Sequence, residues 1–162
     1  MNEEKYIKII SILILITSCI IFVFQINTAF AADYTKWVDA CKPYKETVQN
    51  ILREEGISPE YYYLMVAESR CKEKAQSAAG ARGFWQLMPA TGRRFGCKDL
   101  HDIDCATHAA AKYIKSLEAR FDTFEEVIIA YNMGGHNYIK HGKSAQALGL
   151  VRRVRMIQKA DR

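Results

Sequence analysis

The stretch ISPEYYYLMVAES, residues 57–69, predicts a helix that carries an acidic side chain into apolar surroundings. Ser58 is a good helix N-cap, and Pro59 suits the first helical position. One face then holds the side chains at i, i+3, i+4 and i+7, which are Tyr61, Leu64, Met65 and Glu68. A carboxyl group on such a face has a raised pKa and can stay protonated near neutrality, as a general acid requires. The alternative is a partly covered face, on which Glu68 forms an ion pair with an Arg or a Lys.

The rest of the chain predicts more helices, separated by short loops that contain glycine. We expect them to cover about 35–54, 89–96, 104–120 (with a start at 107 as the alternative), 123–133 and 144–159. The segment at 75–83, between the acidic helix and the helix at 89–96, has small residues and glycines, and it is expected to be a loop. Strand-like alternation is almost absent. Helices with short connections pack on one another, so the expected fold class is all-α.

The N-terminal segment is typical of an export leader. Residues 7–26 form an almost continuous apolar run that follows two lysines. Ala29 and Ala31 come next at A-x-A spacing, which predicts cleavage by signal peptidase before Ala32. We therefore expect residues 1–31 to be a signal peptide.

Removal of this leader leaves residues 32–162, which are enough for one compact domain and too few for two. Two other interpretations of the leader stay open. The apolar run is long enough to remain as an uncleaved membrane anchor. Residues 16–19 also resemble a lipobox, which would place a lipid on Cys19. All three interpretations place the domain outside the cytoplasm, in the periplasm or cell envelope.

The cysteines agree with export. After the leader the chain has four of them, Cys41, Cys71, Cys97 and Cys105, and an even number predicts two disulfides. Three pairings are open. We favour Cys97–Cys105, which closes a short loop, and this choice leaves Cys41 for Cys71. A structural zinc site is the competing interpretation, but no two of these cysteines form a C-x-x-C pair. The histidines do not cluster either, so we expect no metal and no cofactor.

The formal net charge is +5, and it belongs to the predicted domain because the leader's charges cancel. Basic residues concentrate at 152–155 and Lys159. Such a surface suits a polyanion, for example nucleic acid, anionic lipid or an acidic cell-wall polymer. We favour the simpler interpretation that these residues form the solvated face of a terminal helix.

Three segments are expected to form a site together. The first is Glu68-Ser69 at the end of the acidic helix. The second reads GFWQ at 83–86 and continues into Pro-Ala-Thr at 89–91. The third reads AYNMG at 130–134. Their order and spacing resemble the lytic transglycosylases of the SLT (soluble lytic transglycosylase) domain family, which share a goose-type lysozyme fold. The sequence from Trp85 to Gly96 is most similar to the membrane-bound type D branch, and the resemblance covers about residues 57–140.

This resemblance implies a lysozyme-like helical domain with a cleft, in which Glu68 is the catalytic residue. It implies substrate-binding roles for six others: Ser69, Gly83, Trp85, Gln86, Tyr131 and Asn132. Tyr131 is expected to donate a hydrogen bond to Glu68. Trp85 and Phe84 would offer flat faces to sugar rings, although a core position is an equal alternative for one of them. Tyr113 is expected in the core.

Most glycosidases use two carboxylates, but only Glu68 lies in a plausible site. Asp99, Asp102 and Asp104 belong to what the sequence predicts to be an exposed loop. The resemblance implies that the N-acetyl group of muramic acid supplies the second function. Glu68 would act first as acid and then as base, and the sugar's 6-hydroxyl would close a 1,6-anhydro ring. The expected partner is the peptidoglycan glycan strand, with a secretion or conjugation apparatus as a further partner and no nucleic acid. The alternatives are a hydrolytic muramidase and a catalytically idle wall-binding subunit.

Overall fold

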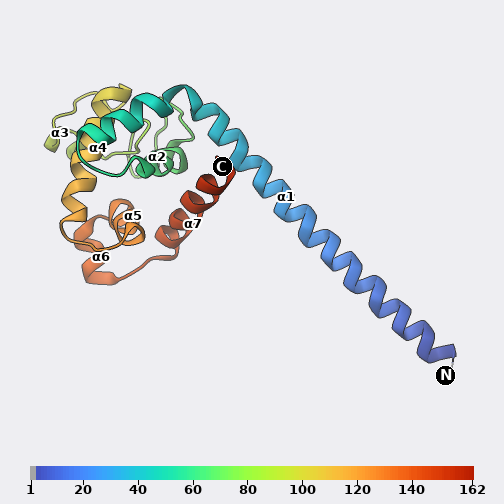
Figure 1. Ribbon diagram of the computed structural model, residues 1–162. Helices are drawn as coiled ribbons and strands as arrows, with labels where there is room; N and C mark the ends of the chain where they lie inside the picture. Colours follow the sequence, from blue (N-terminus) through green and yellow to red (C-terminus); the bar gives the residue numbers. More distant parts are fainter. Residues whose placement is uncertain (1–2) are drawn as a thin grey trace. The chain divides into compact units, whose positions relative to one another are not determined.

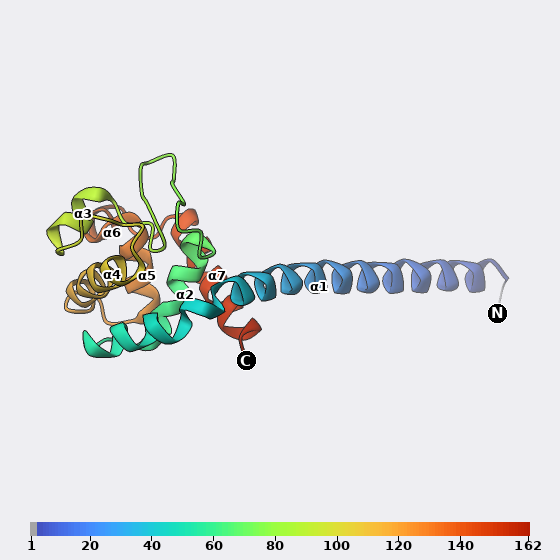
Figure 2. The same cartoon turned by 90° about the horizontal axis from the view of Figure 1, so that it is seen from above.

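The computed structural model describes the backbone of residues 3–162 and the side chains of residues 9, 11–22 and 33–162. It divides into two units at Tyr34 and Thr35. The described part contains seven α-helices and one short 3₁₀ helix, and its only β-type pairs are two isolated bridges. Figure 1 and Figure 2 show helices α2 to α7 gathered in the second unit. The expected all-α fold class is confirmed.

Helix α1 runs from Glu3 to Glu54, so the helix expected at 35–54 is the last part of a longer one. The sequence between residues 26 and 35 contains neither glycine nor proline, and nothing there ends the helix. Within the described residues, no helix has both the length and the apolar character needed to cross a membrane. Ala29, Ala31 and Ala32, the predicted cleavage site, lie outside the residues whose side chains are described.

The acidic helix begins as expected at the Ser58 cap. The Ser58 hydroxyl accepts a hydrogen bond from the Glu60 amide at 3.2 Å. The first turn, Pro59–Tyr61, is a 3₁₀ helix (η1), and the α-helix α2 follows over Tyr62–Ser69. The side chains of its apolar face, Tyr61, Leu64 and Met65, are buried. Burial of this face holds α2 in the core and brings its last turn, with Glu68, to a fixed position.

The remaining helices are α3 (Pro89–Arg94), α4 (Ile103–Glu118), α5 (Phe124–Met133), α6 (Gly135–His141) and α7 (Ala145–Ala160). Side-chain caps define several of their starts. Thr123 and Glu126 form the expected capping box of α5, and Ser144 caps α7. Helix α7 packs against both α2 and α5, and α4 also packs against α5. Helix α2 thus packs on α7, and most of its side chains are buried.

Helix α6 is a difference from the sequence-based expectation. The sequence predicts helices at 123–133 and 144–159, with none between them, because the Gly134-Gly135 pair is expected to stop the first of these two. Gly134 does end α5, with a φ of 81°, but Gly135 is the first residue of α6. Glycine is a poor helix former, so its presence argued against a helix there. Contact of α6 with α5 overrides this weak local preference.

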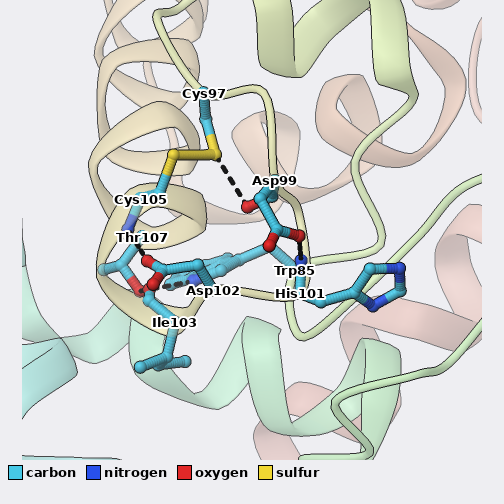
Figure 3. The surroundings of a disulfide bond; sticks show 8 residues. All are labelled: Trp85, Cys97, Asp99, His101, Asp102, Ile103, Cys105 and Thr107. Atoms are coloured by element: carbon cyan, nitrogen blue, oxygen red, sulfur yellow. Dashed lines mark hydrogen bonds between the residues drawn. A yellow bond between two sulfur atoms is a disulfide. The ribbon is translucent and has the colours of Figure 1, made fainter.

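Both expected disulfides are present. Cys41–Cys71 connects α1 to the turn that follows α2. Cys97–Cys105 connects the segment after α3 to the first turn of α4 (Figure 3). In the same view Asp102 caps α4, accepting a hydrogen bond from the Cys105 amide at 2.7 Å. The first disulfide thus fixes the end of the acidic helix to α1, and the second fixes the segment after α3 to α4.

Candidate active site

A cavity of about 330 Å³ lies at the C-terminal end of α2. Its walls come from α2, the loop that follows, α3, α4, α5 and the start of α7. Four of the residues expected at the site line this cavity: Glu68, Gln86, Tyr131 and Asn132. The fold therefore brings together segments that are separated by more than 60 residues in the sequence.

Glu68 lies in the wall of this cavity; the residue as a whole is partly exposed, but its carboxyl group is largely shielded from water. Burial raises its pKa from 4.5 to about 7, because removal from water disfavours the charged form. The positive charge of Arg153 and a hydrogen bond from Asn132 lower this pKa, but burial has the larger effect. No ion pair within 4 Å involves Glu68 in the described part of the chain. The alternative interpretation, a direct ion pair at Glu68, therefore finds no support.

Tyr131 lines the cavity but does not donate to Glu68. Its hydroxyl donates to the backbone carbonyl of Trp85 at 2.8 Å. A phenol has only one proton to donate, so the expected hydrogen bond from Tyr131 to Glu68 is wrong. Burial, and then the nearby Glu68 charge, raise the pKa of Tyr131 well above its usual value. Tyr131 thus stays neutral and ties α5 to the loop that carries Gln86.

Gln86 is in an unusual backbone conformation for a residue that is not glycine, with a φ of 48°. Its side-chain amide holds the loop in this conformation by donating to the carbonyls of Gly83, at 2.9 Å, and Ala75, at 3.1 Å. Both amide protons are therefore used within the loop. The carbonyl oxygen of Gln86 is the part of this side chain that a ligand could contact.

The cavity lining does not include Ser69, Gly83 or Trp85. The Ser69 hydroxyl is buried, and it accepts a hydrogen bond from the Cys71 amide at 3.0 Å. Trp85 is fully buried, and its indole donates to Thr107 at 2.9 Å (Figure 3). These residues therefore support the cavity wall without being part of its lining.

Sequence reasoning missed several residues of the cavity, of which Tyr113 is the largest. It was expected in the core of α4, but it is half-buried and lines the cavity. Its ring lies 5.2 Å from that of Tyr131 and 5.6 Å from that of Phe95, between ring centroids. The helical spacing of α4 places Tyr113 near its buried stripe, and spacing alone does not show where this stripe meets a cavity. Thr91, Met88 and Gln146 also line the cavity.

Glu68 is the only acidic residue among the described residues that line the cavity. Asp99, Asp102 and Asp104 are exposed, as expected, and they lie around the Cys97–Cys105 loop. No group of three or more His, Cys, Asp and Glu side chains in the described part could hold a metal ion. The cavity therefore offers one carboxyl group, poised between its protonated and ionised forms near neutral pH, with amide and hydroxyl groups beside it.

The comparisons with known proteins agree with this geometry. The family model described as "Transglycosylase SLT domain" matches residues 46–150. The chain is 30% identical over 130 residues to the membrane-bound lytic murein transglycosylase D of Escherichia coli strain K12, with 76% of this chain and 28% of the relative covered. The protein of the same name from Escherichia coli O6:H1 strain CFT073 gives the same values. The chain thus spans 28% of the length of these curated relatives.

Proposed function

Because the chain belongs to the transglycosylase SLT domain family, we propose that it is a peptidoglycan lytic transglycosylase. Its substrate would be the β-1,4 bond between N-acetylmuramic acid and N-acetylglucosamine. The observation that carries this proposal is a single carboxyl group, Glu68, with a pKa of about 7 in a cavity of suitable size. A lone acid that must later act as a base needs such a pKa, because both forms must be accessible at one pH.

In the proposed reaction, protonated Glu68 donates its proton to the glycosidic oxygen, and the bond from C1 to this oxygen breaks. Positive charge develops at C1, and the substrate's own N-acetyl group stabilises it. The Glu68 carboxylate then takes the proton of the muramic acid 6-hydroxyl while that oxygen bonds to C1. The product is a 1,6-anhydromuramoyl end, no water is consumed, and Glu68 returns to its protonated form.

The neighbours of Glu68 support this sequence of steps. Asn132 donates a hydrogen bond to the carboxyl group, which favours its charged form and keeps the raised pKa within reach of neutrality. Tyr131 and Gln86 hold the wall of the cavity through their hydrogen bonds to the loop at 75–85. We propose Gln86 and Asn132 as the residues that contact the glycan, and Ser69, Gly83 and Trp85 as supporting residues.

The domain fits an extracytoplasmic location. The two disulfides are typical of oxidising compartments, and both matched relatives are named as membrane-bound. We propose that residues 1–31 are an export leader and that residues 32–162 form one catalytic domain in the periplasm or cell envelope. A secretion or conjugation apparatus is a further candidate partner, suggested by the sequence resemblance alone.

The products of digested cell wall test the proposal. Purified protein is incubated with peptidoglycan, and the released fragments are analysed by mass spectrometry. We expect muramic acid ends in the 1,6-anhydro form. Reducing muramic acid ends would contradict this and would identify the runner-up, a hydrolytic muramidase. Absence of any cleavage would indicate the other alternative, an idle wall-binding subunit.

The pH dependence of the activity is expected to report the pKa of Glu68. The first step needs the protonated form, so kcat/KM should fall as the pH rises through about 7. Arg153 lowers this pKa, and an Arg153→Gln variant should therefore move the fall to higher pH. Arg152→Gln is the matched control, because it removes the same charge from an exposed neighbour. An equal displacement in both variants, or none in Arg153→Gln, would contradict the assignment.

A further inference from the structure

A second cavity, of about 370 Å³, adjoins the one that contains Glu68. Thr91, Tyr113 and Gly134 line both cavities, so one wall is shared. The other walls of the second cavity come from the end of α3, the end of α4 and the start of α6. A substrate that lies against Glu68 could therefore extend past Tyr113 into this neighbouring space.

The second cavity is basic. Arg94, Arg120 and His136 line it, and none of the described residues in its wall is acidic. Elsewhere in the domain, Arg155 and Lys45 pair with Glu125 and Asp161. By contrast, neither Arg94 nor Arg120 has a carboxylate partner within the described part of the molecule. The cavity thus presents two exposed guanidinium groups that form no ion pair with a carboxylate among the described residues.

The guanidinium of Arg120 lies close to a glycine. A Cβ atom built on Gly135 would lie 3.0 Å from Nη1 of Arg120, a tight contact that a small shift of the arginine side chain would relieve. The absent side chain lets the guanidinium lie against the backbone where α6 begins. The guanidinium of Arg94 lies 5.5 Å from the centroid of the Phe95 ring. Tyr113 lies at the border of the two cavities. Burial raises the pKa of its phenol, and the positive charges of Arg120 and Arg94 partly oppose this rise.

We propose that this basic cavity binds a carboxylate of the peptide stem that is attached to muramic acid in peptidoglycan. The inference rests on the proposed function. Arginine is the side chain best suited to carboxylates, because its planar donors can form two parallel hydrogen bonds with one carboxylate. The stem branches from the same sugar whose C1 is attacked at Glu68, so it leaves the glycan close to the shared wall. The enzyme would therefore favour glycan strands that still carry peptides.

The test compares two forms of one substrate, peptidoglycan fragments with their stems and the same fragments after an amidase has removed them. Binding is measured in a Glu68→Gln background, which needs no catalysis, and kcat/KM is measured with Glu68 intact. For Arg94→Gln/Arg120→Gln we expect about 10–100-fold weaker binding and lower kcat/KM on the peptide-bearing form, since charge-assisted hydrogen bonds are lost. On the stripped form we expect no change. Arg94→Lys/Arg120→Lys should recover part of the loss.

Arg152→Gln is the control for charge alone, since this arginine is exposed on α7 and does not line the cavity. Thermal unfolding checks that each variant is folded. Equal losses on both substrates, or no loss on either, would overturn the proposal. Failure of the proposed function gives a different result, because the protein with Glu68 intact would then make no anhydro ends. The comparison of binding to peptide-bearing and stripped fragments would still test the cavity.

Discussion

Replacement of Glu68 by glutamine is expected to reduce the formation of anhydro products by about 10²–10⁴-fold, the usual contribution of a positioned acid–base group. Glutamine has nearly the same shape and keeps a hydrogen-bonding group beside Asn132, but it has no acidic proton to give. No second acidic residue among the described lining residues could replace it. The measurement is the rate at which 1,6-anhydro ends appear in digested peptidoglycan.

Glu73→Gln is the matched control, because it removes an exposed carboxylate from the loop that follows α2. It should leave the rate unchanged. Survival of activity in Glu68→Gln would show that Glu68 is not the acid.

The protein with Glu68 intact should also lose stability relative to Glu68→Gln as the pH rises from 4.5 to about 7. Over this range the unfolded state releases the Glu68 proton while the folded state retains it, so the loss could reach about 3 kcal/mol.

Gly83→Ala is expected to lower the free energy of unfolding by about 2–5 kcal/mol, for two reasons that add. The backbone of Gly83 has a φ of 72°, a conformation that side chains disfavour. A Cβ atom at this position would also lie 1.7 Å from the carbonyl oxygen of Leu100, so the backbone must move. Because the Gly83 carbonyl accepts from Gln86 at 2.9 Å, this movement should disturb the cavity as well. Urea unfolding and the activity assay measure the two effects.

Gly80→Ala separates the two reasons. Gly80 has a φ of 89°, and no heavy atom lies within 4 Å of the position its Cβ would take. Only the backbone cost remains, about 1–2 kcal/mol. Equal losses in Gly80→Ala and Gly83→Ala would show that the loop relaxes around Leu100 at no cost, and that close packing there does not constrain the site.

The candidate site was predictable where the signal was local. Helical spacing placed Glu68 on the same face as Leu64 and Met65, and the structure buries that face. Thr123 and Glu126 form the capping box that their spacing predicted. The cysteine count predicted two disulfides, and the structure has both. Each of these conclusions depends on residues close together in the sequence, or on covalent chemistry.

Other parts of the site were not predictable, because they depend on contacts between distant segments. Tyr131 was expected to donate to Glu68, but the carbonyl that its hydroxyl reaches belongs to Trp85. Trp85 itself is held in the core by Thr107, and Tyr113 turned out to line both cavities. Helix α6 forms although it begins with glycine. No short stretch of sequence predicts these outcomes, because each depends on contacts between residues that only the folded chain brings together.

The sequence by itself determined that this is a helical domain with one acid on an apolar face, because periodicity and caps act over a few residues. The tertiary structure alone decided how strongly that acid is perturbed. The pKa of Glu68 depends on how completely the surrounding helices exclude water, and on Asn132 and Arg153, which lie more than 60 residues further along the chain. It also decided that two arginines, neither of them in an ion pair within the described part of the chain, lie next to the acid's cavity. Distances between separate helices are set only when their buried faces pack together.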